Sequence, residues 1–426
     1  MRARSASITA TDFCMAIAAV AGAMLLIFAA AQAQAQTFQV LHAFSGGADG
    51  SDPLSPLTLD RAGNVYGTAF EGGGIGAGSV FKLSQKASGW IFTPLHSFQG
   101  SDGANPIAAL LIGSDGRLYG TTATGGIWHA CSHGYPFAGC GVVYRLQPPP
   151  TNCRNALCPW TETVLYNFTG FADGDTPNAG ALVSDSQGNL YGETIWGGNQ
   201  NYGVVYKMTP SAGGWTQSAI HSFVWADGVT PVPGLISDSD GNLYGAGEEG
   251  GGQYGCGTVF ELSPGQYGWS LGVLHSFTCT PYELPIGGIG LDQAGNIYGL
   301  FDSDIYHAGG LYQLTNSGYG WNMDILHNFT TSNPDDGWWQ GGGPVFDRYG
   351  NLYHVTFGEG AYGMGTVFKL SPGDGGWTYT VLHDFTGGSD GANPQAGLTI
   401  DSDGNLYGTA RHGGDGGHGV VFKITP

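Results

Sequence analysis

A short string of residues recurs seven times along the chain and limits the possible folds more than any other feature. Its clearest copy is Asp401-Ser402-Asp403-Gly404-Asn405-Leu406-Tyr407-Gly408. The repeated tyrosines are separated by 53, 72, 53, 54, 55 and 54 residues, and they are Tyr66, Tyr119, Tyr191, Tyr244, Tyr298, Tyr353 and Tyr407. A period of this length is typical of repeat architectures, in which each copy builds one supersecondary unit.

Each repeat reads as four short β-strands, which we name A to D from the centre outwards. Strand A is the apolar run before the aspartate, B is the Asn-Leu-Tyr-Gly run, C resembles Val420–Ile424, and D resembles Val381–Phe385. The chain has 77 glycines in 426 residues and 12% aromatic residues, which suits short strands joined by tight turns. Seven four-stranded units predict an all-β, seven-bladed β-propeller.

The register of the repeat at the two ends predicts how the ring closes. The segment 38–44 reads as a strand D, whereas the last segment, 420–424, reads as a strand C. We therefore expect the N-terminal strand to complete the last blade, which leaves few exposed sheet edges. The alternative is an open solenoid, but a solenoid needs polar caps and has no use for this phase shift.

The first 35 residues have the pattern of a secretion signal. Arg2 and Arg4 precede an apolar run, and Ala31-Gln32-Ala33-Gln34-Ala35 offers small-residue cleavage sites. We expect a signal peptide over 1–35 and the propeller over 36–426, in a secreted or periplasmic protein with no membrane span in the mature chain. The net charge of −20 disfavours nucleic acids and anionic lipids as partners.

Six cysteines follow the signal, and an even number in an exported chain favours disulfides over free thiols. Cys256 and Cys279 flank a C–D strand pair of blade 4 and are predicted to be bonded to each other. Cys140 has the same place in blade 2, but Gly170 stands where its partner would be. We therefore expect Cys131–Cys140 and Cys153–Cys158. The spacings do not fit a zinc site, and we expect no metal or cofactor.

Because consecutive strands are antiparallel, the B–C and D–A loops share one face of the disc, here termed the loop face. The A–B and C–D turns share the opposite face, termed the turn face. The D–A loops repeat an Asp-Gly pair at Asp49, Asp102, Asp173, Asp227 and Asp390. A ring of carboxylates that binds calcium or sugar hydroxyls is one interpretation. Turn formation is the interpretation we favour, because nearly every blade has the pair.

Two further repeated features are expected to be structural. The histidines of strand D lie far apart at the rim and predict packing between blades; they are His42, His96, His221, His275, His327 and His383. The Asp-x-Asp-Gly-Asn strings lack the twelve-residue frame of a calcium loop, so they predict A–B turns.

The repeat breaks down in blades 4 to 6, where aromatic residues and carboxylates enter the loops. The predicted ligand-binding residues are Trp225, Tyr282, Glu283, Asp302, Asp304, Asp336, Trp338 and Trp339. Aromatic faces stack on sugar rings, and carboxylates accept hydroxyl hydrogen bonds. This pattern favours a monomeric binding or interaction scaffold for a polysaccharide or protein ligand, rather than an enzyme.

Two alternatives remain open at this point. A carbohydrate-active enzyme, either a glycoside hydrolase or a lyase, would use two of the carboxylates Glu283, Asp302, Asp304 and Asp336 as acid and base on the loop face of blades 4 to 6. A purely structural cell-surface protein would need no ligand, and the irregular loops would then reflect decay of the repeat.

The combined pattern is Leu-x-x-Phe, Asp-Gly-x-x-Pro, Asp-Gly-Asn-Leu-Tyr-Gly, Gly-Gly, Gly-x-Val-Phe-Lys-Leu and Gly-Trp. It resembles the Gloeo-Verruco (GloVer) tandem-repeat family of exported bacterial proteins over residues 38–426. Blade 5 departs from the pattern most. The resemblance implies no particular activity and no catalytic residues.

Overall fold

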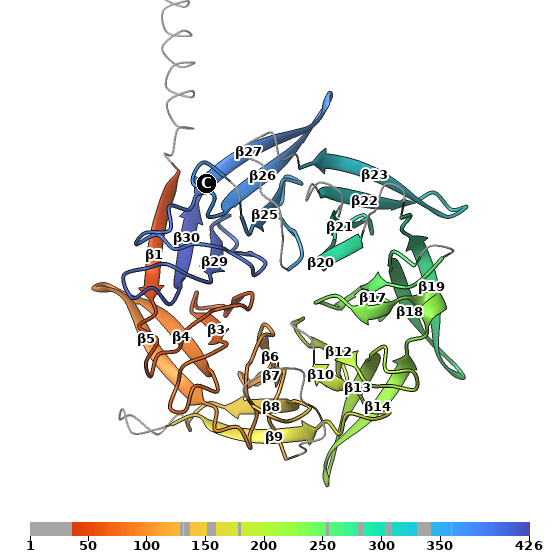
Figure 1. Cartoon of the computed structure of the whole chain (residues 1–426), viewed down its shortest axis with the longest axis horizontal. Helices are drawn as coiled ribbons and strands as arrows, with labels where there is room; N and C mark the ends of the chain where they lie inside the picture. Colours follow the sequence, from red (N-terminus) through yellow and green to blue (C-terminus); the bar gives the residue numbers. More distant parts are fainter. Residues whose placement is uncertain are drawn as a thin grey trace, which may run out of the picture.

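The computed structural model describes residues 36–127, 131, 137–150, 159–177, 180–252, 255–279, 284–302, 309–329, 342–358 and 360–426. These residues form seven antiparallel sheets around a central axis, as Figure 1 shows. The predicted all-β, seven-bladed propeller is therefore confirmed. No helix in the described part of the chain is long and apolar enough to cross a bilayer.

The first three blades follow one another from the N-terminal side of the ring. Their strands are β2 (Thr58–Leu59), β3 (Val65–Ala69), β4 (Ser79–Lys86) and β5 (Gly89–Ser97); β6 (Leu111–Ile112), β7 (Leu118–Thr122), β8 (Val142–Gln147) and β9 (Thr161–Asn167); and β10 (Asp175–Pro177), β11 (Val183–Ser184), β12 (Leu190–Trp196), β13 (Val204–Ser211) and β14 (Gly214–Ser222).

The remaining four blades complete the ring. Their elements are the 3₁₀ turn η1 (Trp225–Asp227) with β15 (Val229–Pro231), β16 (Ile236–Ser237), β17 (Leu243–Glu249), β18 (Thr258–Gly265) and β19 (Gly268–Ser276); β20 (Leu284–Leu291), β21 (Ile297–Asp302), β22 (Gly310–Asn316) and β23 (Trp321–Asn328); β24 (Val345–Phe346), β25 (Leu352–Thr356), β26 (Thr366–Gly373) and β27 (Gly376–Asp384); and β28 (Thr399–Ile400), β29 (Leu406–Ala410), β30 (Val420–Thr425) and β1 (Thr37–Ala43).

The last blade joins the two ends of the described chain. Strand β1 pairs antiparallel with β30, with Val40 opposite Phe422, and the sheet order is β1-β30-β29-β28. In Figure 1 the red β1 lies against the blue β30. The predicted closure by the N-terminal strand is confirmed, and an open solenoid is excluded.

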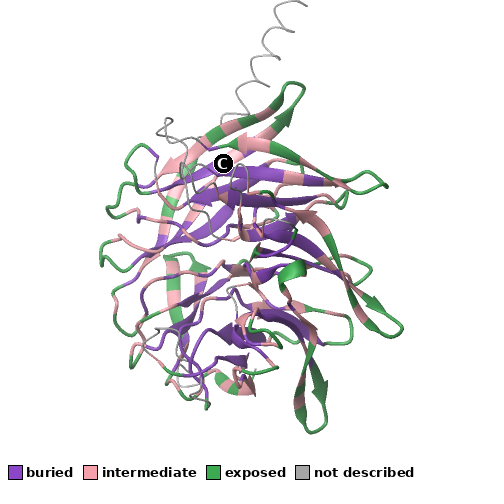
Figure 2. Cartoon of the chain, turned by 45° about the vertical axis from the view of Figure 1, so that its right-hand side comes forward, coloured by how far each residue is buried: buried purple, intermediate pink, exposed green. Residues whose placement is uncertain are grey.

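The core lies between successive blades, and Figure 2 shows buried inner strands with exposed hairpin tips. The glycine of strand B makes room for the aromatic ring of strand C. A Cβ atom on Gly67 would lie 2.6 Å from Cζ of the Phe81 ring and 2.8 Å from Cδ2 of Leu57. In blade 6 His354 takes this place and is fully buried; its Nδ1 lies 2.7 Å from the carbonyl oxygen of Val355.

In every blade except blade 2, which has Gly113 at this position, the A–B turn is held by the first aspartate of the repeated string. The Asp401 carboxylate accepts hydrogen bonds from the backbone of Asp403 and Asn405, from the Asn405 amide and from the Tyr407 hydroxyl. Burial tends to raise the pKa of Asp401, but the bonds from Asn405 and Tyr407 outweigh it and lower that pKa. These strings are therefore turns, as predicted, and the first carboxylate of the string holds the turn.

The repeated Asp-Gly pairs and histidines form a second structural unit at the rim. Nε2 of His42 lies 3.2 Å from Oδ2 of Asp49, which also accepts the backbone N–H of Ser45. The His42 ring stacks on Phe92 of the neighbouring blade, with ring centres 4.1 Å apart. The same His–Asp contact occurs at His96, His221 and His383. Both residue types are structural in these blades, which confirms turn formation and packing between blades.

Two predicted disulfides are present, Cys131–Cys140 and Cys256–Cys279, with Cα–Cα distances of 5.0 and 5.6 Å. Gly170 lies directly beside the first of these bridges, since a Cβ atom on this residue would lie 2.4 Å from Sγ of Cys131. Cys131 thus supplies the partner of Cys140 that Gly170 cannot supply. The predicted Cys153–Cys158 pair lies outside the described residues.

Candidate ligand-binding site

A cavity of about 770 Å³ occupies the propeller axis, where the innermost segments of all seven blades meet. Glycine, proline and aliphatic residues form most of its wall, and these segments include Leu54, Ile107, Gly180–Ala181, Pro233–Ile236, Gly288–Leu291, Gly342–Phe346 and Gln395–Leu398. A Cβ atom on Gly180 would lie only 2.3 Å from the backbone nitrogen of Gly234. Neighbouring inner segments are therefore in backbone contact, and small residues are required there.

The end of this cavity at the loop face carries its polar groups. Phe70 and Arg411 directly follow β3 and β29, at the start of their B–C loops, and Gln395 precedes β28 in a D–A loop. Within the described residues, Nε of Arg411 and Oε1 of Gln395 are buried and have no hydrogen-bond partner. We term Phe70, Gln395 and Arg411, together with Asp52 beside them, the cavity mouth.

Arg411 is only loosely engaged by its neighbours. Its Nη2 lies 3.8 Å from Oδ2 of Asp52, which is longer than a hydrogen bond, and about a third of its side chain is exposed. Burial and the Arg411 charge lower the pKa of the adjacent His412, although Asp52 opposes them. His412 is therefore predominantly neutral at pH 7, and the fixed positive charge at the mouth is that of Arg411.

Two carboxylates occupy the strand position of Arg411 in blades 4 and 5. Glu248 lies in β17 and Asp302 ends β21. Burial raises the pKa of Glu248, and the negative charges of Glu249 and Asp302 raise it further. The charges of Glu248 and Asp302 thus interact across neighbouring blades, on the loop face.

The residues predicted from sequence to bind ligand are mostly outside the described structure: Tyr282, Glu283, Asp304, Asp336, Trp338 and Trp339. Of the other two, Trp225 is 48% exposed in a D–A loop and packs near Tyr202, with ring centres 6.3 Å apart. Neither Trp225 nor Asp302 lines the central cavity. Asp302 is nevertheless close enough to Glu248 for their charges to interact.

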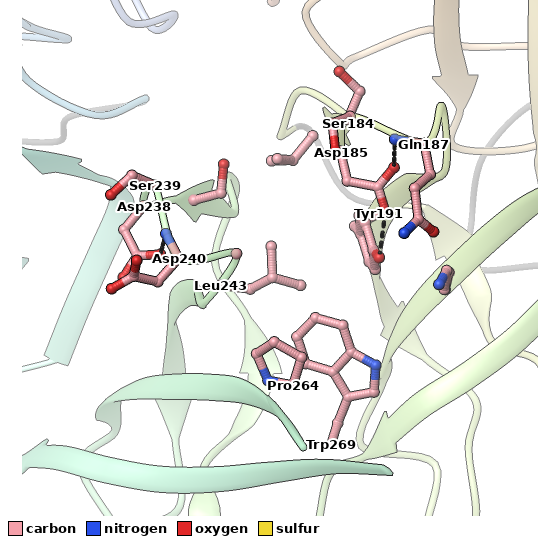
Figure 3. Close-up of a pocket in the computed structure, with 15 residues that line it drawn as sticks. Ser184, Asp185, Gln187, Tyr191, Asp238, Ser239, Asp240, Leu243, Pro264 and Trp269 are labelled. Carbon is pink, nitrogen blue, oxygen red and sulfur yellow. Dashed lines mark hydrogen bonds between the residues drawn. The ribbon is translucent and has the colours of Figure 1, made fainter. Parts of the chain in front are cut away.

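A second cavity, of about 530 Å³, lies on the turn face between blades 3 and 4. Figure 3 shows Tyr191 and Trp269 between two A–B turns. The carboxylate of Asp185 accepts bonds from the Gln187 backbone and the Tyr191 hydroxyl, and Asp238 accepts a bond from the Asp240 backbone. These carboxylates hold their turns, so this groove is less suited to ligand binding than the cavity mouth.

The sequence interpretation missed Arg411 and Gln395 because both lie in the blade that best matches the repeat. The sequence nevertheless marks their surroundings at one position of the repeat, four residues after the repeated tyrosine, where strand B ends or has just ended. The residues at that position in the seven blades are Phe70, Ala123, Ile195, Glu248, Asp302, Phe357 and Arg411. A position that varies this widely within an otherwise constant repeat indicates a surface free to acquire function.

Comparison with solved structures shows resemblance in fold. An ulvan lyase of a new polysaccharide lyase family, bound to -[GlcA(1-4)Rha3S]-, is 12% identical with a TM-score of 0.55, covering 89% of this chain and 94% of its own. Another polysaccharide lyase is 10% identical with a TM-score of 0.51, covering 88% and 89%. A PQQ-bound aldose sugar dehydrogenase from Streptomyces coelicolor is 13% identical, with a TM-score of 0.44 and coverage of 92% and 98%.

At these identities the two polysaccharide lyases show likeness in fold alone. No curated protein matches the chain. The model of the Gloeobacter/Verrucomicrobia repeat, in contrast, matches three overlapping ranges, 26–154, 129–337 and 291–426, which together span the seven blades. The chain therefore belongs to the Gloeobacter/Verrucomicrobia repeat family.

Proposed function

We propose that this protein is an exported propeller that binds a carbohydrate ligand at the cavity mouth, and that it acts by binding rather than by catalysis. The observation that carries the proposal is the combination of an apolar axial cavity with Arg411 and Gln395, two side chains whose hydrogen-bonding capacity is incompletely used. Buried polar atoms are normally paired, and a bound water or ligand is one way in which such atoms gain a partner.

The composition of the mouth suits a sugar. Phe70 and the aliphatic wall offer an apolar surface for the C–H face of a pyranose ring, and Gln395 offers an acceptor for a hydroxyl. The cavity volume lies within the range of roughly 300–1,000 Å³ that is usual for small-molecule sites. One or two sugar units at the end of a longer chain would fit this size.

A glycan hydrolase or lyase is the second candidate, and one observation favours it. Glu248 and Asp302 pair two carboxylates on adjacent blades, and the pKa of Glu248 is raised by burial and by neighbouring negative charge. A raised pKa is what a general acid needs, while a second carboxylate acts as base or nucleophile. Release of reducing ends from a polysaccharide, abolished by Glu248→Gln, would establish this activity.

The experiment for the proposed function is a thermal-shift screen of the purified protein against neutral and acidic oligosaccharides, with and without calcium. A ligand at 100 times its Kd is expected to stabilise the protein by about 2.7 kcal/mol. Gln395→Leu, which places at this position the residue that blade 1 has at Leu54, should weaken binding without loss of folding. No shift with any sugar would contradict the proposal and favour a purely structural role.

Export is part of the same proposal. The leader-like segment 1–35 and the two disulfides support an oxidising destination outside the cytoplasm. N-terminal sequencing of the secreted protein should find a start after Ala33 or Ala35. An unprocessed Met1 on the exported protein would contradict cleavage.

A further inference from the structure

Among the residues that the structure describes, Arg411 is the single lysine or arginine in the loops of the loop face. The other described basic residues lie in the A–B and C–D turns or on strand C. Those on strand C include Lys82, Lys207 and Lys423, which cover tyrosine rings of strand B at distances of 5.2 to 5.6 Å. Within the described part of the chain, Arg411 is thus the single fixed cation of the face on which the axial cavity has its polar end.

Building on the proposed carbohydrate function, we propose that Arg411 makes the cavity mouth selective for a sugar that carries one carboxylate, that is, a uronic acid residue. A guanidinium presents paired N–H donors that match the two oxygens of a carboxylate. Among the described residues, the carboxylate paired with Arg411 is that of Asp52, at 3.8 Å, so a ligand carboxylate can gain hydrogen bonds that Asp52 does not make. Gln395 lies in the same wall to accept a hydroxyl.

Charge limits the ligand to few negative groups. The protein has a net charge of −20, and the described loops and strand ends of the loop face carry acidic residues such as Asp52, Glu71 and Glu248. A polyanion would bring many of its charges against these carboxylates, whereas a single carboxylate needs only Arg411. Repulsion over longer distances is screened within roughly 8 Å at physiological ionic strength.

The repeat supplies replacements that keep the local structure. Asp52 has its counterparts in Asn105 and Asn393, and these three residues share a positive φ of 52 to 56°. The amide of Asn105 donates to the carbonyl of Phe70 at 3.2 Å, and that of Asn393 donates to Phe357 at 3.0 Å. Asp52→Asn can therefore form the same bond to the Arg411 carbonyl while removing the charge that competes for its guanidinium.

The test is calorimetric titration with two matched probes, a plain xylo-oligosaccharide and the same oligosaccharide bearing one glucuronic acid. The acidic probe should bind more tightly to the native protein. Arg411→Ala, which introduces the residue found at Ala123 in blade 2, should weaken the acidic probe about 10- to 100-fold and the neutral probe much less, as expected for loss of hydrogen bonds to a charged group. Asp52→Asn should strengthen binding of the acidic probe.

The control is Arg348→Gln, which removes the same charge from an A–B turn on the opposite face and should leave both affinities unchanged. Equal binding of both probes, unaffected by Arg411→Ala, would overturn the selectivity while leaving carbohydrate binding intact. Failure of both probes and of every other sugar to bind would overturn the proposed function as well. Tighter binding of a highly sulfated polyanion than of the singly charged probe would also contradict the inference.

Discussion

Glu162 provides a quantitative test of the packing between blades 1 and 2. It lies on β9, half-buried, and its Oε1 is covered and has no hydrogen-bond partner among the described residues. Burial raises the pKa of Glu162 to about 7; the charge of His96 opposes this and that of Asp102 reinforces it. Blade 3 has Gln217 at the same place in strand D, so Glu162→Gln replaces the carboxyl with a side chain that the repeat already accommodates.

The magnitude follows from the two pKa values. A difference of about 2.5 between the folded value of about 7 and the ordinary 4.5 corresponds to about 3.4 kcal/mol at high pH. Since the side chain is partly exposed, solvent screening reduces the expected effect to about 1–2 kcal/mol. Because the folded pKa is raised, the contribution of Glu162 to stability is fully present below pH 4.5 and is lost as pH rises through 7.

Calorimetric melting of both proteins at pH 5 and pH 8 checks this account. At about 2.1 cal/mol/K per residue over roughly 390 residues, 1–2 kcal/mol corresponds to a Tm rise of about 1–2 °C for Glu162→Gln at pH 8. The difference between the proteins should shrink towards pH 5, and comparing them at each pH cancels the other titrating groups. An equal difference at both pH values, or destabilisation by Glu162→Gln at pH 8, would show that the buried Glu162 carboxylate does not destabilise the folded protein at high pH.

Three further predictions concern the scaffold. Replacing Cys256 and Cys279 by serine should cost about 3.5 kcal/mol, from the loop-entropy relation for a separation of 23 residues, and urea unfolding measures it; no loss would show that the bridge does not stabilise the fold. Gly67→Ala should cost about 1–3 kcal/mol in the same assay because its Cβ would overlap Phe81, and a neutral result would contradict the packing described for strand B. The pKa values of A–B turn aspartates such as Asp401 are lowered, so their ionised carboxylates stabilise the fold above about pH 4, and this stabilisation is lost as the pH falls further. The Tm should therefore fall in acid, and Asp401→Asn should reduce that fall.

Most of the fold could be predicted from the sequence because its rules are local and repeated. The string around Tyr407 encodes a strand and the turn before it, and seven copies leave little choice of architecture. The offset between 38–44 and 420–424 encodes ring closure, and β1 pairs with β30 accordingly. The Cys256–Cys279 bridge followed from the pairing of neighbouring strands alone.

The length of strand A was predicted less well from the sequence. The repeat predicts an apolar run of several residues, but β2 and β28 are only two residues long. The inner segments contain glycine and proline and approach the neighbouring blades closely, as Gly180 does Gly234. Backbone contact around the axis therefore replaces a long strand ladder, and this depends on how seven blades converge.

The cavity mouth could not be identified from sequence for a related reason. Interpretation of the repeat drew attention to its irregular loops, whereas Arg411 and Gln395 belong to a regular blade. They meet Phe70 of the next blade only because the ring brings the first and last repeats together. Trp225, in contrast, lies in a D–A loop and does not line the axial cavity.

A crystal structure of the protein soaked with the glucuronic acid-bearing xylo-oligosaccharide would show whether the ligand binds where the axial cavity meets the loop face. We expect sugar density against Phe70 and Gln395, with the carboxylate on the Arg411 guanidinium. Density in the turn-face groove beside Trp269, or at any site away from Arg411, would contradict it.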